Sequence, residues 1–171
     1  MKPFVRLTVA LAMLIPVGAL SAGPAGAAGG TTCKSPSGTL TFSPGVSSVA
    51  KVQTININLP ISGCVGGGVK SGVFKGSLKT AAVAIKDLGK LSTNLKLTST
   101  ITWNTKKTST LTASSKTTTG KVITSTVTGK ISKGLFVGLN FKDVQTVTFG
   151  PIINNTIKTL KITGKGSLTI K

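Results

Sequence analysis

The chain has 171 residues and a net charge of +19, carried by 21 Lys and Arg residues against two acidic ones. It contains no His, no Glu and no Tyr, and its only Arg is Arg6. These missing side chains perform most proton transfer, metal ligation and bidentate phosphate binding in proteins. The composition therefore disfavours an enzyme or a metalloprotein, and we predict no catalytic, cofactor-binding or metal-binding residues.

The N-terminus is typical of a secretory signal peptide. Lys2 and Arg6 form a basic region, Leu7–Leu20 is mostly apolar, and Ala25-Gly26-Ala27 places small residues before a cleavage site. A membrane-spanning helix would need about 20 apolar residues, and a proline and a glycine interrupt this run. We expect residues 1–27 to be removed and a single secreted domain to span 28–171, located outside the cell or at its wall.

The mature segment contains two cysteines, Cys33 and Cys64. An even pair in an exported chain predicts a disulfide. A reactive thiol or a metal pair would instead require a CxxC motif, a His or a strongly electropositive partner, and none of these occurs.

Apolar residues alternate with polar ones along most of the mature segment. In Thr93–Trp103 the apolar positions are Leu95, Leu97, Ile101 and Trp103, and the residues between them include Lys and Thr. Such alternation predicts a strand with one buried face. Further apolar stripes run through Ile55–Ile61, Ile123–Ile131, Leu135–Phe141, Val147–Phe149, Leu160–Ile162 and Leu168–Ile170. The stretch Thr80–Leu88 also fits a short helix.

Glycine, proline and asparagine separate these runs. The predicted turns are Ser43-Pro44-Gly45, Gly66-Gly67-Gly68, Asn104-Thr105-Lys106, Thr119-Gly120, Lys133-Gly134 and Gly150-Pro151. Together the pattern predicts an all-β domain, an antiparallel meander of about 8–10 strands. The long strands and interior glycines favour a barrel, with the first and last strands as neighbours. A two-sheet sandwich is the alternative.

Four segments resemble those of a group of small exported β-rich proteins of actinobacteria. They are SGTLTFSPG (Ser37–Gly45), SGC (Ser62–Cys64), VKSGVF (Val69–Phe74) and ISKGLF (Ile131–Phe136). The motifs are turn and strand signals, so the resemblance implies a β-rich exported fold and no activity. Many members carry a second cysteine pair, which this chain lacks.

Candidate chemical groups are few. Asp87 and Asp143 are the only side-chain carboxylates, and a glycosidase could in principle use such a pair. Each follows a Lys near the end of an apolar run, so we expect solvated turn residues. The segment Gly63–Ser71 is unlike a true phosphate-binding loop, because Val69 separates the last glycine from Lys70. A Ser–Lys nucleophilic pair stays open, although no motif singles one out.

Lysine supplies all the positive charge of the mature segment, which is +17 once the charges of Lys2 and Arg6 are removed. Charge spread in this way favours attraction to anionic polymers of the cell envelope. A specific nucleic-acid ligand is disfavoured because Arg is absent and Trp103 lies on an apolar stripe. We therefore expect a non-enzymatic binding or structural protein of the cell envelope.

The alternative is a soluble barrel that carries a small apolar ligand. Its interior cavity would be lined by Leu95, Leu97, Ile101, Trp103 and their partners, whereas a filled interior would exclude it.

Threonine recurs at alternate positions in three segments. These arrays are Thr98/Thr100/Thr102, Thr108/Thr110/Thr112 and Thr124/Thr126/Thr128. If their strands were adjacent they would form a hydroxyl lattice, as in ice-binding or O-glycosylated surfaces. An ordinary solvent-facing strand surface would look the same, and we favour that interpretation.

Overall fold

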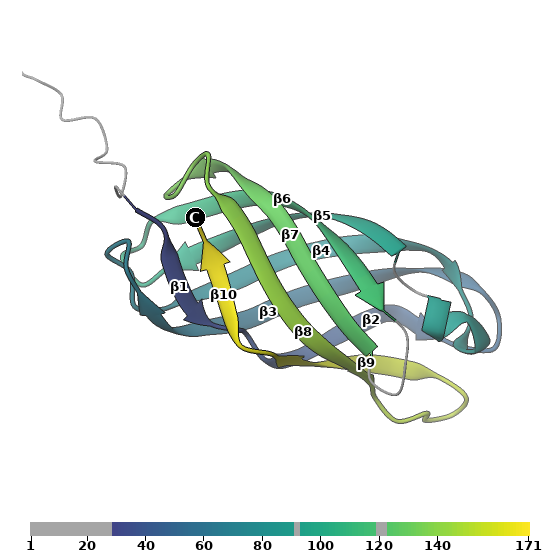
Figure 1. Cartoon of the computed structure of the whole chain (residues 1–171). Coiled ribbons are helices and arrows are strands. Elements are labelled where there is room, and N and C mark those ends of the chain that lie inside the picture. The colour runs from purple at the N-terminus through teal and green to yellow at the C-terminus, as the bar shows by residue number, and fades with distance from the viewer. Residues whose placement is uncertain (1–28, 91–92, 119–122) are drawn as a thin grey trace, which may run out of the picture.

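A computed structural model describes residues 29–90, 93–118 and 123–171, without the side chains of residues 89–95 (Figure 1). The predicted signal peptide and the predicted turn at Thr119-Gly120 lie outside these residues. Ten strands and one short 3-10 helix make up the described fold. They are β1 (Thr31–Lys34), β2 (Gly38–Val46), β3 (Lys51–Val65), β4 (Gly72–Val83), η1 (Ile85–Lys90), β5 (Thr93–Trp103), β6 (Thr108–Thr118), β7 (Ile123–Gly134), β8 (Asn140–Phe149), β9 (Ile157–Gly164) and β10 (Ser167–Ile170).

The strands form a closed antiparallel barrel. Consecutive strands pair from β2 to β9, and β9 returns to pair with β2, which closes eight strands into a ring. The short strands β1 and β10 pair with each other and extend the wall between β3 and β8. The predicted barrel and the pairing of the first and last strands are confirmed, and the sandwich alternative is wrong.

Close backbone approach inside the wall requires glycine at some strand positions. A Cβ added to Gly129 of β7 would lie 2.4 Å from the carbonyl oxygen of Thr112 and 2.8 Å from the Cβ of Ala113. Backbone atoms cannot yield to such contacts, so β6 and β7 come this close only because residue 129 has no side chain.

The two ends of the barrel differ. We call the end that holds β1 and the chain's C-terminus the terminal end, and the opposite end the η1 end; they lie at left and right in Figure 1. The interior of the terminal end is filled by large apolar side chains that are 2% exposed or less. They are Ile61, Ile101, Trp103, Leu111, Ile131, Leu168 and Ile170.

Trp103 organises the packing at the terminal end. Its ring meets Phe136 edge to face, with centroids 5.5 Å apart, and its Nε1 donates to Ser109 Oγ over 2.8 Å. Ser109 Oγ in turn donates to the carbonyl oxygen of Leu135. The indole is therefore both packed and hydrogen-bonded, which buried Trp requires, and the prediction that it belongs to the apolar stripe is confirmed.

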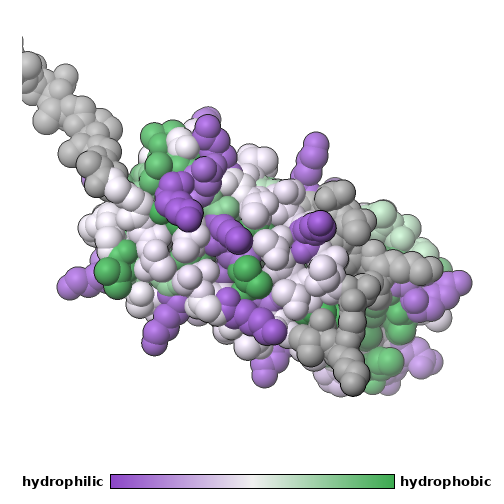
Figure 2. All heavy atoms as spheres, viewed as in Figure 1, coloured by the Kyte–Doolittle hydropathy of each residue, from purple (hydrophilic) through white to green (hydrophobic). Residues whose placement is uncertain are grey.

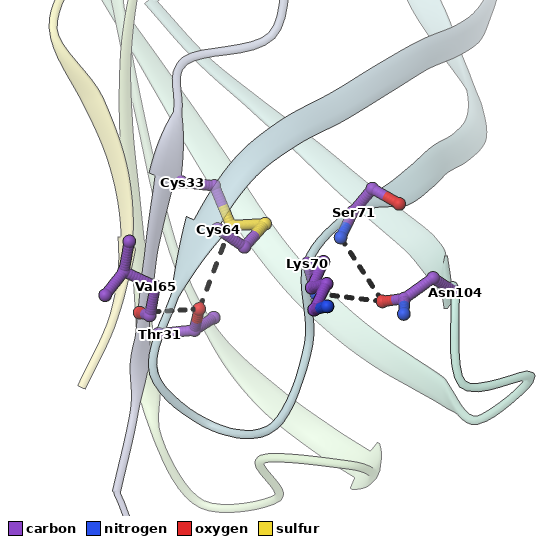
Figure 3. Close-up of a disulfide and its surroundings, with 7 residues drawn as sticks. All are labelled: Thr31, Cys33, Cys64, Val65, Lys70, Ser71 and Asn104. Atoms are coloured by element: carbon purple, nitrogen blue, oxygen red, sulfur yellow. Dashed lines mark hydrogen bonds between the residues drawn. A yellow bond between two sulfur atoms is a disulfide. The ribbon is translucent and has the colours of Figure 1, made fainter.

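The predicted disulfide joins β1 to β3 at this end (Figure 3). Thr31 Oγ1 donates to the carbonyl oxygen of Val65 over 3.1 Å and lies 3.9 Å from Cys33 Sγ. Beside it, Asn104 Oδ1 accepts hydrogen bonds from the backbone N–H groups of Lys70 and Ser71 at 2.9 and 3.2 Å. The disulfide and these bonds tie the turns and β1 into one unit.

Three local expectations need correction or refinement. The residues Ser43-Pro44-Gly45 do not reverse the chain but lie within β2, where the ladder with β9 shifts register. Gly45 N donates to the buried Gln53 Oε1 over 2.8 Å, so these turn-forming residues bend a strand instead of ending it. The predicted short helix is present as η1, but Ala81 and Ala82 belong to β4 and are exposed.

The apolar stripe predicted through Leu135–Phe141 is also wrong for its first half. Residues 135–138 form a turn between β7 and β8, flanked by Gly134 and Gly138 with φ of 84° and 87°. Phe136 is buried at φ 66°, while Val137 is 60% exposed. The positive φ values break the two-residue periodicity, which holds only for an extended chain.

Candidate functional site: a cavity inside the barrel

The interior of the η1 half is not filled. It holds a cavity of about 120 Å³ whose wall is mostly apolar. The apolar lining comprises Leu40, Phe42, Ile55, Ile57, Leu78, Leu88, Leu97, Ile123, Val127, Val147, Phe149, Leu160 and Ile162. Leu88 is 6% exposed and reaches the lining from η1, which covers this end of the barrel.

Smaller side chains at inward positions leave this space. β6 places Leu111 and Ala113 inward in the packed half, then Ser115 and Thr117 beside the cavity. On β8, Val147 and Phe149 are only half-buried although they line the cavity, so the cavity is not sealed from the outside.

Polar residues cross one side of the cavity in a single row. Thr117 of β6 is directly opposite Ser125 of β7, and Ser125 is directly opposite Gln145 of β8. All three line the cavity. We call them the polar row. Together with Ser115, which lies two residues before Thr117 on β6, they are the polar residues of a mostly apolar lining.

Asp143 lies two residues before Gln145 on β8, on the same face of the strand, and is fully buried. Gln145 Nε2 donates to its Oδ2, and Ser35 Oγ hydrogen-bonds to its Oδ1. Burial raises the pKa of this carboxyl above its ordinary value of 3.8, and the hydrogen bonds from Ser35, Gln145 and the Val144 backbone only partly oppose this. The prediction that Asp143 is a solvated turn residue is wrong, because β8 turns it into the barrel.

Ser35 gives Asp143 only a shared hydrogen bond. Its Oγ also lies 3.0 Å from the carbonyl oxygen of Val144, and a hydroxyl has a single proton to donate. The hydrogen bonds therefore compensate the burial of this carboxyl only in part.

A second, smaller cavity of about 50 Å³ adjoins the first and reaches this carboxyl. Leu40, Leu97 and Gln145 line both spaces, and Asp143 lines only the smaller one. Among the described side chains, Ser99 Oγ is the one buried polar atom without a hydrogen-bond partner, and its strand β5 also carries Leu97. Two adjoining spaces with several polar side chains in their lining thus lie next to the packed terminal end.

The cavity differs from the one expected from the sequence. Leu97 lines it as predicted, but Ile101 and Trp103 belong to the packed terminal end, and the side chain of Leu95 lies outside the described residues. Sequence reasoning missed the polar row, although Ser115 and Thr117 continue the inward alternation of Leu111 and Ala113. The available signal was that these polar residues occupy the alternate strand positions that face the interior.

The outer surface carries the charge. Every Lys whose side chain the structure describes is exposed, and hydrophilic side chains project around the whole outline of the molecule (Figure 2). Asp87, the other carboxylate, lies in η1, on a different element from the buried Asp143. The structure thus places the described Lys side chains on the exterior, whereas the lining of the interior cavity is mostly apolar.

Two of the threonine arrays are paired residue by residue. Thr98, Thr100 and Thr102 of β5 stand opposite Thr112, Thr110 and Thr108 of β6. The third array is offset, because its members pair with Ser114, Lys116 and Thr118. The outer face thus carries a two-strand threonine lattice that a third strand does not continue.

The structure also shows where the glycine-rich segment considered in the sequence analysis lies. Gly66, Gly67 and Gly68 form the turn after the disulfide-bonded Cys64, with φ of 92°, 60° and 69°. Within the described residues no three His, Cys, Asp or Glu side chains gather as metal ligands would. The described helical segment is too short to cross a membrane.

Comparison of the chain with protein-family models, with curated proteins and with solved structures finds no match.

Proposed function

We propose that this domain is secreted and is a non-enzymatic binding protein that carries a small apolar ligand in the η1 half of its barrel. The supporting observation is the cavity itself, which lies beside an interior otherwise packed with large side chains. The side chains around this space of about 120 Å³ lack packing partners on that side and lose those contacts. A ligand that fills the space would supply such contacts.

The cavity volume limits the ligand. An engineered cavity of about 150 Å³ in another protein takes up benzene, and the space here is 120 Å³. The part of the ligand that enters therefore has the size of one aromatic ring or a short alkyl chain, and a longer molecule would extend out past Val147 and Phe149.

Toluene is a suitable first probe. Methyl NMR spectra of the mature domain should show shifts for Leu97 and Val127, which line the cavity, and none for Leu168 in the packed end. A Val147→Phe variant should fill the space and abolish these shifts. The matched control is Thr148→Phe, because residue 148 is exposed on the outer face of the same strand. Absence of any shift at saturating toluene, or unchanged binding by V147F, would refute the proposal.

We further propose that the exterior associates with anionic polymers of the cell envelope. The exposed Lys residues on the outer wall and the charge of +17 on residues 28–171 favour this role. Contacts of this kind are screened beyond about 8–10 Å at physiological salt. Binding of the mature domain to isolated cell walls should therefore collapse by about 1 M NaCl. Neutralising Lys106 or Lys161 alone should change it little, whereas strong binding that survives the salt would indicate a specific site.

A further inference from the structure

We infer that the cavity selects an uncharged ligand bearing a hydroxyl on one side of an apolar body, over both a pure hydrocarbon and a carboxylate. This inference rests on the proposed carrier function and names the chemical class of the ligand. Its basis is the position of the polar row relative to the apolar walls and to the buried Asp143.

The polar row lies on three adjacent strands and at one level. Thr117, Ser125 and Gln145 are direct cross-strand partners, and neighbouring strands are about 4.8 Å apart. A single hydroxyl bound near Ser125 is therefore within reach of groups on both sides. The walls on β2 and β3, formed by residues such as Leu40 and Ile57, offer only apolar contact. A bound molecule consequently has one favourable orientation.

Gln145 is the best-positioned partner for a ligand hydroxyl. Its Nε2 is held by Asp143, which fixes the plane of the amide beside the cavity. The amide oxygen is then an acceptor that needs little reordering when a ligand arrives. Pre-organised groups of this kind strengthen binding because less side-chain freedom is lost.

An anion would be poorly stabilised in this space. The residues that line the larger cavity include no Lys, and every Lys whose side chain the structure describes is exposed. The described carboxyl of Asp143 lines the adjoining smaller cavity and is itself buried. Moving an unpaired carboxylate from water into such surroundings is costly. The cationic exterior would attract anions to the surface without admitting them to the interior.

Three ligands of similar size separate these possibilities: toluene, phenol and benzoate. Their dissociation constants for the mature domain are measured at pH 7 by methyl NMR titration. A wholly apolar cavity would favour toluene over phenol by about tenfold or more, because the hydroxyl would lose its hydrogen bonds to water. We expect phenol to bind at least as tightly as toluene, and benzoate to bind at least about tenfold more weakly than phenol.

A double variant assigns the selectivity to the polar row. Thr117→Val with Ser125→Ala should keep toluene binding and weaken phenol by about tenfold. The control, Ser114→Ala with Thr146→Val, makes the same changes at neighbouring positions that alternate to the outer face and should leave both affinities unchanged.

The wild-type comparison needs no variant and decides the inference alone. Toluene bound about tenfold more tightly than phenol, or benzoate bound best at the cavity methyl groups, would overturn it while leaving the carrier function intact. Failure of all three ligands to bind would overturn both.

Discussion

Replacing Asp143 with Asn should stabilise the domain at neutral pH. The substitution keeps the shape of the side chain and removes its ability to ionise. In the wild type, burial raises the pKa of this carboxyl above 3.8 in the folded state. The folded state therefore binds the proton more tightly than the unfolded state. The resulting stability is fully present below the unfolded pKa and is lost as pH rises through the raised value.

The size of the effect follows from the surroundings of the carboxyl. Asp143 is fully buried and is hydrogen-bonded by Ser35 and Gln145, groups that carry no charge. Each unit by which the folded pKa exceeds the unfolded one removes about 1.4 kcal/mol once the group has ionised. The Asn side chain retains an acceptor for Gln145 and a donor for Ser35. We expect Asp143→Asn to be more stable than the wild type at pH 7, by the amount of stability that the wild type loses as pH rises from about 4 to 7.

Urea unfolding at a series of pH values measures this directly. The window from about pH 4 to 8 is unusually clear, because the chain has no His and no Glu to titrate there. Wild-type stability should fall across the window and that of Asp143→Asn should not. A flat wild-type profile, or an Asn variant less stable than the wild type at pH 7, would show that the hydrogen bonds stabilise a carboxylate and would refute the reasoning.

Three further predictions concern the packed end. Removing the disulfide by Cys33→Ser with Cys64→Ser should lower the free energy of unfolding by about 3.5–4 kcal/mol, since it closes a loop with a sequence separation of 31 residues; chemical denaturation of both forms measures it. Ser109→Ala should cost about 1–3 kcal/mol by leaving the buried indole N–H without an acceptor, and a loss below the measurement error would contradict this. Leu111→Ala should lower the free energy of unfolding by about 2–5 kcal/mol, whereas Val147→Ala beside the cavity should lower it by less than about 1 kcal/mol. Equal losses of stability in thermal unfolding would mean that the two halves are packed alike.

Strand positions were predictable because the relevant signal is local. The alternation in Thr93–Trp103 coincides with β5 from end to end, since a half-buried strand imposes a period of two residues on its own sequence. Closure of the barrel was predictable for a similar reason. Long strands and interior glycines signal strong curvature, and the pairing of β2 with β9 is its result.

The location of Asp143 was not predicted, although its position in the strand indicates it. The segment from Phe141 to Phe149 places residues 141, 143, 145, 147 and 149 on one face, and that face is inward. The polarity of Asp143 and Gln145 hid this, because the apolar stripe looks interrupted between Phe141 and Val147. Polar residues at interior positions interrupt the alternation of apolar and polar residues by which strands are recognised.

The volume of the interior depends on contacts that no local pattern encodes. Ser115 and Ser125 leave space only because β6 and β7 bring them to the same part of the barrel, where the opposite wall does not fill the gap. Register between neighbouring strands is set by turns and bulges, such as the irregularity between Thr110 and Leu111. The sequence pattern therefore predicts which residues face inward, but not where the inside is hollow.

The two faces of each strand would allow the barrel to perform the two proposed roles independently. The described Lys residues and the two paired threonine arrays occupy outward positions, while the cavity and its polar row occupy inward ones. The packed terminal end, with its disulfide, holds the wall in shape so that the η1 half can remain open. Neutralising outward Lys residues should then release the protein from anionic polymers without changing toluene binding. Filling the cavity with Val147→Phe should do the reverse. If either change affected both properties, the interior and the exterior would belong to one site, and the division of the barrel into two independent surfaces would be wrong.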